Sequence, residues 1–167
     1  KLRKERLGEA KNDLPSYNEL LGKLDGLKGL GYIVNYIFLK HGTRNKDINL
    51  KYVLKLPKQK EDENYLVYNK NKIVLDINDY KTDKTFGSKS IIINDKKFIE
   101  ELKSLNLKDG EYLISKKNGD KLKMSSFNER ILNMTIDKLG EAKLFKVLIA
   151  DLLGKKDFSK IEELVNS

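Results

Sequence analysis

The sequence predicts an α+β domain that is mainly helical and carries a small antiparallel sheet of three to four strands. Apolar residues recur at helical spacing before Arg44 and again after Asp95, whereas short β-branched runs between turn residues fill the stretch between them. The 167 residues contain no repeat and no linker-like stretch, and this length can bury one hydrophobic core. We therefore expect residues 1–167 to form a single domain, with residues 1–14 as an exposed N-terminal arm or helix.

Two helices are expected before Arg44. Ser16 can cap the first helix, and Glu19 three residues later completes a capping box. The apolar stripe of this helix consists of Leu20, Leu21, Leu24 and Leu27. The second helix, over about residues 32–40, is apolar nearly all round, so we expect it to be buried in the middle of the fold.

The middle of the chain is expected to form the sheet. The predicted strands are residues 52–56, 65–68, 73–77 and 90–93. Residues 69–72 are typical of a turn between two antiparallel strands, and residues 79–87 form a longer polar connection before the last strand.

The second half of the chain is expected to be helical again. The predicted helices are residues 96–105, 126–139, 143–153 and 159–165. Asp95 caps the first of them, Ser125 or Ser126 caps the second, and Gly140 ends that second helix. Residues 109–123 read as a loop with a short extended piece at residues 112–114.

The charge balance favours a polyanionic partner. The chain has a formal net charge of +9, and the segment from Lys40 to Lys60 holds many basic residues with Asp47 as its one acid. Such a surplus favours DNA, bound through its phosphate backbone with low sequence specificity. The alternative stays open that the abundant lysine reflects an AT-rich genome and a solvated surface.

Composition also argues against several classes of protein. The chain has no Cys and a single histidine, His41, so a disulfide framework and a thiolate metal site are excluded, and we expect no metal and no cofactor. We also expect no small-molecule substrate. No apolar run approaches the roughly 20 residues of a membrane-spanning helix, and the charged start does not resemble a secretory signal. We expect a location in the cytoplasm, the nucleus or a virion, without secretion.

Three local patterns carry a family resemblance. Residues 38–50 combine an apolar helix end, Gly-x-Arg ending at Arg44, and an acidic residue three positions on. Tyr80-Lys81-Thr82 lies in the connection before the last predicted strand. Residues 125–167 form a helical second half, and residues 144–153 within it supply the third pattern. In their order, these patterns resemble the catalytic domain of tyrosine recombinases (phage integrases), and the composition is similar to recombinase-like proteins of large DNA viruses.

The resemblance implies the fold of that catalytic domain and a set of site residues. Arg44 would be the first catalytic arginine, which contacts the scissile phosphate, and Lys81 would be the catalytic lysine. The expected contacts to the DNA backbone are Lys40, Lys46, Lys84, Lys89 and Lys146.

The chain departs from the family at the positions that the chemistry needs. Ala142 and Phe145 stand where the family has His-x-x-Arg, and no tyrosine follows Tyr112. Attack of a tyrosine hydroxyl on a phosphodiester needs cations on the non-bridging oxygens and an acid for the leaving oxygen. Lys146 would replace the charge of the missing arginine, but not its bidentate fork. We therefore expect no strand transfer by this chain alone.

Three other interpretations remain open at this point. In the first, the chain is an active integrase fragment that stops short of its tyrosine. In the second, it is a structural virion-associated protein, such as a minor capsid or scaffold protein, that reuses the fold. The third is a nuclease, because Asp79-Tyr80-Lys81 matches a short D-x-K element and Asp76 precedes it. Two carboxylates and a lysine can hold Mg²⁺ and activate water.

Overall fold

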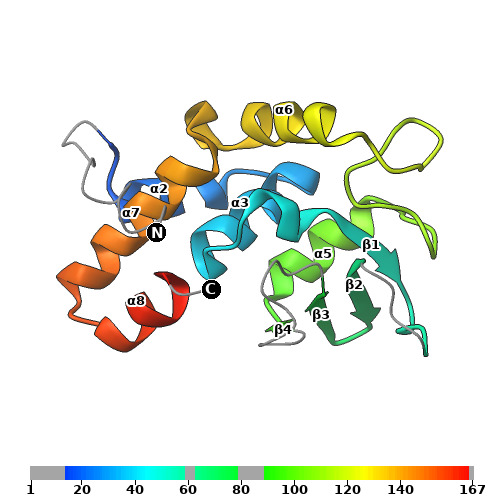
Figure 1. Ribbon diagram of the computed structural model, residues 1–167, viewed down its shortest axis with the longest axis horizontal. Coiled ribbons are helices and arrows are strands. Elements are labelled where there is room, and N and C mark those ends of the chain that lie inside the picture. The colour runs from blue at the N-terminus through cyan, green and yellow to red at the C-terminus, as the bar shows by residue number, and fades with distance from the viewer. Residues whose placement is uncertain (1–13, 59–62, 79–88, 166–167) are drawn as a thin grey trace.

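The computed structural model describes residues 14–58, 63–78 and 89–165 (Figure 1). These residues confirm the α+β class, with six α-helices and a four-stranded sheet. The elements, in chain order, are α2 (Tyr17–Asp25), α3 (Gly29–His41), the 3₁₀ turn η1 (Asn45–Ile48), β1 (Leu50–Val53), β2 (Asn64–Asn69), β3 (Lys72–Ile77), β4 (Lys89–Ile93), α5 (Lys96–Ser104), α6 (Met124–Met134), the 3₁₀ turn η2 (Ile136–Lys138), α7 (Gly140–Gly154) and α8 (Phe158–Val165). The predicted arm falls almost wholly on residues 1–13, which lie outside the described ranges.

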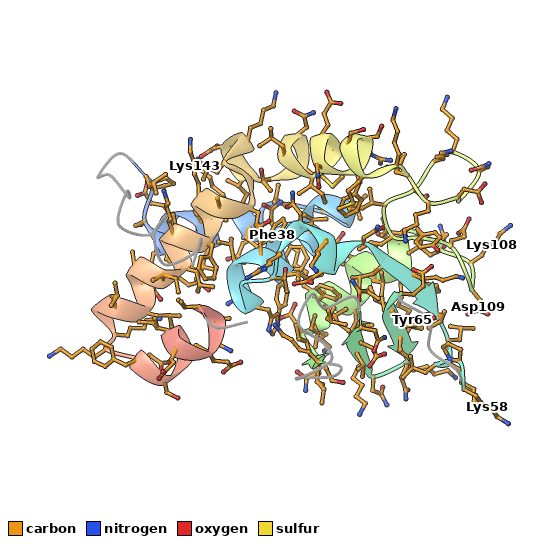
Figure 2. All side chains as sticks on the ribbon, viewed as in Figure 1. Phe38, Lys58, Tyr65, Lys108, Asp109 and Lys143 are labelled. Atoms are coloured by element: carbon orange, nitrogen blue, oxygen red, sulfur yellow. The ribbon has the colours of Figure 1, made fainter. Side chains whose placement is uncertain are left out.

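The first two helices follow their sequence signals. The Ser16 hydroxyl oxygen accepts a hydrogen bond from the Glu19 amide at 3.1 Å, and the Glu19 carboxylate accepts one from the Ser16 amide at 3.1 Å. This reciprocal pair confirms the predicted capping box. Helix α3 lies at the centre of the molecule, where Figure 2 shows Phe38 among the other elements. The Phe38 side chain is 1 % exposed. The prediction of a buried central helix is therefore confirmed.

The sheet has the order β1-β2-β3-β4 and is mixed. Strands β2, β3 and β4 pair antiparallel, but β1 pairs parallel to β2, so the prediction of an antiparallel sheet is wrong for this strand. Because β1 and β2 run in the same direction, they do not form a hairpin. The predicted first strand is also displaced, because pairing begins at Leu50 and ends at Val53.

The free side of β1 is covered by a segment from later in the chain. The Tyr52 amide donates to the Glu111 carbonyl at 2.7 Å, and the Leu113 amide donates to the Leu50 carbonyl at 2.8 Å. The short extended piece predicted near residue 112 therefore lies along β1. Strand β1 is hydrogen-bonded on both of its sides.

The break between α6 and α7 differs from the prediction. Helix α6 ends at Met134, five residues before the predicted end at Leu139, and Gly140 begins α7 instead of ending α6. The buried side chain of Asn35 explains the break: its amide donates to the Met134 carbonyl at 3.0 Å, and its oxygen accepts from the Ile136 amide at 2.9 Å. The start of α6 also differs, since Lys123 is the N-cap and neither predicted serine caps it.

Two apolar clusters hold these elements together. The main core joins α2, α3 and α5–α7 to one face of the sheet. A satellite core lies between α7 and α8 and consists of Phe145, Leu148, Ile149, Leu152 and Leu164. Among the described residues, no helix combines the length and the apolar character needed to cross a membrane.

Candidate nucleic-acid interface

The segment after α3 holds Arg44 in a fixed turn. Gly42 adopts a left-handed conformation with φ of 61° and ends α3, and its amide donates to the Phe38 carbonyl at 3.0 Å. Arg44 then precedes η1, and its amide donates to the Asp47 carboxylate at 3.1 Å. The acidic residue three positions after Arg44, noted in the sequence, therefore has a structural role in closing this turn.

Side chains from the sheet and from α7 fix η1 in place. The side-chain amide of Asn64 on β2 donates to the Lys46 carbonyl at 3.2 Å, and the backbone amide of Asn78 donates to the Asn64 side-chain oxygen at 2.7 Å. From the other side, the Glu141 carboxylate accepts a hydrogen bond from the Asn45 amide at 2.9 Å. The backbone that carries Arg44 and Lys46 is thus attached both to β2 and to the first turn of α7.

Lys89 reaches the same region from β4. Lys89 pairs with Ile77 across the β3–β4 ladder, and the Ile77 side chain is buried in the main core. Directly paired residues share one face of a sheet, so Lys89 leaves β4 on the face that the helices cover. Lys89, Lys46 and Arg44 all lower the pKa of Asp47, which indicates that their charges lie near this carboxyl.

Asp47 is an unusual carboxyl in this setting. It is 4 % exposed, and burial raises its pKa in spite of the Arg44 amide and the three nearby cations. Its second oxygen has no hydrogen-bond partner in the described part of the chain. Burial therefore outweighs the attraction of the cations, and the ionised carboxylate is incompletely compensated.

His41 is the last residue of α3 and is the second titratable group near these cations. Burial is the main cause that lowers its pKa, to about 4, followed by the charges of Lys160, Lys89 and Lys40. Lys160 comes from α8, one helical turn before Leu164. A Cβ on Gly42 would lie 3.2 Å from a Leu164 methyl group, so α8 is packed against the end of α3.

We call Lys40, Arg44, Lys46, Lys89 and Lys160 the cationic cluster. Its members come from α3, from η1 with the residue before it, from β4 and from α8. In addition to the larger effect of burial, the charges of Lys160, Lys89 and Lys40 lower the pKa of His41, and the charges of Lys89, Lys46 and Arg44 lower the pKa of Asp47, so Lys89 acts on both groups. Four of the five were predicted from the sequence. Lys160 was missed, because nothing in the sequence indicates where α8 packs.

The other predicted site residues have different outcomes. Lys81 and Lys84 lie outside the described residues, as do Asp79 and Tyr80 of the D-x-K element. The role of Lys81 as the catalytic lysine, which the resemblance implies, stays a prediction. Lys146 is half-buried on α7, and no hydrogen bond or ion pair within residues 14–58, 63–78 and 89–165 joins it to the cationic cluster.

Phe145, which the sequence resemblance would align with an arginine of the recombinases, is part of the satellite core. Phe145 is 5 % exposed and packs with Leu148 and Leu164, whereas Ala142 is exposed to solvent. The aromatic ring thus fills space between α7 and α8 and offers nothing to a phosphate. In the described residues, no group of three or more His, Cys, Asp or Glu side chains is arranged to hold a metal ion.

Comparisons with protein-family models, with curated proteins and with solved structures give no match to this chain.

Proposed function

We propose that this domain binds duplex DNA through its phosphate backbone at the cationic cluster, as a recombinase-like module that does not transfer strands. The proposal is supported by cations from separate elements: Lys40, Lys89 and Lys160 act on His41 through their charges, and Arg44, Lys46 and Lys89 act on Asp47. Phosphate contacts from lysine and arginine supply most of the affinity of non-specific DNA binding. The net charge of +9 adds long-range attraction for the polyanion.

The chemistry of the cluster favours low sequence specificity. Four of its members are lysines, whose ammonium groups bind phosphate as point charges and do not read base edges. Arg44 is the one member whose planar fork can bind a phosphate through two parallel hydrogen bonds. Arg44 would therefore hold one phosphate firmly, and the lysines would follow the backbone on either side.

The burial of Phe145 supports a role without strand transfer. A second cation on the scissile phosphate is part of the recombinase chemistry, and this chain has a core aromatic ring at the corresponding position. We propose that the domain acts in the compartment that holds the DNA, which would be the cytoplasm, the nucleus or a virion.

The test is a salt-dependent titration of the full chain with a fluorescent duplex. We expect affinity to fall steeply between about 50 and 200 mM salt, because each released counterion contributes about 0.9 to the slope of log K against log salt. Lys89→Gln and Lys160→Gln should each reduce that slope by about one. No binding at the lowest salt, or binding that is indifferent to salt, would exclude the proposal.

Two exposed lysines outside the cluster serve as matched controls. Lys58 belongs to the basic run of the sequence and Lys108 lies in a loop, and Figure 2 shows both at the end of the molecule opposite α8. Lys58→Gln and Lys108→Gln remove the same charge and should leave the salt slope nearly unchanged. Equal loss in control and cluster variants would indicate attraction by the total charge instead of a site.

A second candidate is a structural module that contacts other virion proteins. Leu153 and Phe158 support it, because they are 52 % and 61 % exposed on either side of the tight turn between α7 and α8. This role predicts concentration-dependent association in sedimentation experiments that Phe158→Ser abolishes, together with the absence of DNA binding at low salt.

A further inference from the structure

Strand β4 lies at one edge of the sheet. It pairs with β3 on one side, and Figure 1 shows it at the end of the sheet away from β1. No segment of residues 14–58, 63–78 and 89–165 pairs with its other side. Strand β1, at the opposite end, is instead covered by residues 111–113. The main-chain groups on the outer side of β4 thus have no partner strand within the described ranges, and such groups can pair with a strand of another chain.

The composition of β4 favours the addition of a further strand. Residues 90–93 read Ser-Ile-Ile-Ile, with no charge and no proline to discourage pairing. The one charge of the strand belongs to Lys89, its first residue. Ile92 is 59 % exposed, although its neighbours Ile91 and Ile93 are buried in the main core. Since successive side chains of a strand point to opposite faces, Ile92 lies on the face of the sheet away from the helices.

An apolar row crosses that face and ends at Ile92. The ladders join four residues side by side, in the order Val53, Val67, Val74 and Ile92. Directly paired residues share one face of a sheet, so the whole row lies on the side away from the main core. Exposure rises from 8 % for Val53 at the covered edge to 59 % for Ile92 at the other. The row is therefore left uncovered at β4.

We propose that β4 pairs antiparallel with β4 of a second copy of this chain, so that the two sheets join across a two-fold axis at Ile92. Ile92 then lies opposite Ile92 of the partner subunit, and the apolar row continues from one copy into the other. The inference goes beyond the proposed function and does not depend on DNA binding.

A second copy fits because the edge of β4 is complementary to itself. Antiparallel pairing about Ile92 keeps each side chain on its own face, so the two main cores stay on the same side of the joined sheet. The backbone of Asp95 is still extended, and in this register Asp95 stands opposite Lys89 of the partner subunit. No like charges therefore face each other along the paired strands. The second copy matches β4 in main-chain pairing, in its apolar row and in charge.

The net charge of the chain opposes this association. Two copies that each carry +9 repel each other at long range, and salt screens that repulsion. Dimer formation should thus become stronger as salt rises, whereas binding to DNA should become weaker. The opposite salt dependences separate this inference from the proposed function, so either can fail without the other.

Sedimentation equilibrium of the full chain, without DNA, measures the association. A single pair of strands makes a small interface, so we expect a monomer–dimer equilibrium between about 10 and 500 μM. Ile92→Lys and Ile92→Glu should each weaken it by about tenfold or more, because like charges then face each other across the axis. An equimolar mixture of the two variants should regain association, since opposite charges then face each other. A mixture that remains monomeric overturns the pairing at Ile92.

Phe158→Ser is the matched control for the loss of an exposed apolar side chain. Phe158 is 61 % exposed but lies on α8, so its replacement should leave the dimer unchanged. Association that Phe158→Ser abolishes and both Ile92 variants retain would overturn the inference and favour the apolar surface at α8. A chain that stays monomeric at about 500 μM in high salt also overturns it.

Hydrogen exchange of the unmodified chain decides the question even if a charged variant fails to fold. Amides among residues 90–93 that face the outer side of β4 should become more protected as the protein concentration rises. The Leu113 amide already donates to the Leu50 carbonyl, so its protection should not change. Protection of residues 90–93 that is independent of concentration would contradict the proposed pairing.

Discussion

Leu164 of α8 lies directly against Gly42 at the end of α3. A Cβ built on Gly42 would come within 3.2 Å of one Leu164 methyl group and 3.1 Å of a Leu148 methyl group. This contact is the point at which α8 is anchored to the central helix, and it brings Lys160 to the cationic cluster. The position of Lys160 in the cationic cluster thus depends on the packing of Leu164 against Gly42.

We expect Gly42→Ala to destabilise the fold by about 1–3 kcal/mol, because the residue has φ of +61° and its added methyl group meets two leucines. Urea denaturation measures the change. Gly22→Ala is the matched control, since Gly22 lies inside α2 with nothing within 4 Å of its added Cβ. That control should stabilise the protein by about 0.5–1 kcal/mol. Equal stabilities of the two variants would contradict this account of α8.

Phe145→Arg tests whether the missing arginine can be restored. Phe145 is buried in the satellite core, so an arginine there either buries an unpaired charge or opens the contact between α7 and α8. We expect a loss of about 3–5 kcal/mol in unfolding free energy. Phe145→Leu keeps an apolar side chain and should cost about 1–2 kcal/mol. An arginine variant as stable as the leucine variant would show that this position opens readily toward a ligand.

Asp47→Asn should tighten DNA binding. The carboxylate is the acidic group at the centre of the cationic cluster, and burial raises its pKa, so its ionised form lacks full compensation. Removing that charge should increase affinity about three- to tenfold at low salt, which corresponds to about 1 kcal/mol. Titration by fluorescence anisotropy measures it. Glu129→Gln, an exposed carboxylate on α6, removes the same charge and should have a smaller effect.

The His41→Gln variant should change the acid stability of the free protein. The folded-state pKa of about 4 lies below the ordinary value of 6.5, so the unfolded chain binds more protons in that interval. Stability is therefore present above pH 6.5 and is lost as pH falls toward 4. Allowing for solvent screening of a half-exposed ring, the loss is about 1–2 kcal/mol. Chemical denaturation across this range should show the loss in the unmodified chain and its reduction in the variant.

The unmodified chain should form no covalent adduct with a suicide DNA substrate, with or without Mg²⁺. The reason is the buried Phe145 ring, which the proposed resemblance aligns with the second arginine, together with the lack of any tyrosine after Tyr112. Gel electrophoresis after denaturation detects an adduct. Nicking that requires Mg²⁺ and disappears in Asp79→Ala would favour the nuclease interpretation instead.

Local signals in the sequence predicted the local structure. The Ser16 capping box and the Asp95 cap, whose carboxylate accepts from the Phe98 amide at 2.9 Å, depend on residues three positions apart. Such contacts form wherever the helix forms, so the sequence alone indicates them. The turn between β2 and β3 was predictable for the same reason.

The features that the sequence did not predict depend on distant partners. Asn35 ends α6 through bonds to Met134 and Ile136, about a hundred residues away. Lys160 joins the cationic cluster because Leu164 packs on Gly42, which no local pattern encodes. Arg44, Lys46 and Lys40 were found because they adjoin one motif, whereas the approach of Lys89 to them follows from strand register.

The parallel position of β1 has a consequence for the order of folding. Strands β2, β3 and β4 follow one another in the chain and pair antiparallel, so their ladders close short loops. Strand β1 instead bonds on one side to β2 and on the other to residues near Tyr112, about 60 residues further along the chain, so this second contact closes a long loop. In pulsed hydrogen exchange during refolding, the amides of β2–β4 should become protected first. The amides of β1 should follow, together with the turn that carries Arg44, so the surface that we propose for phosphate binding would be completed at a late step.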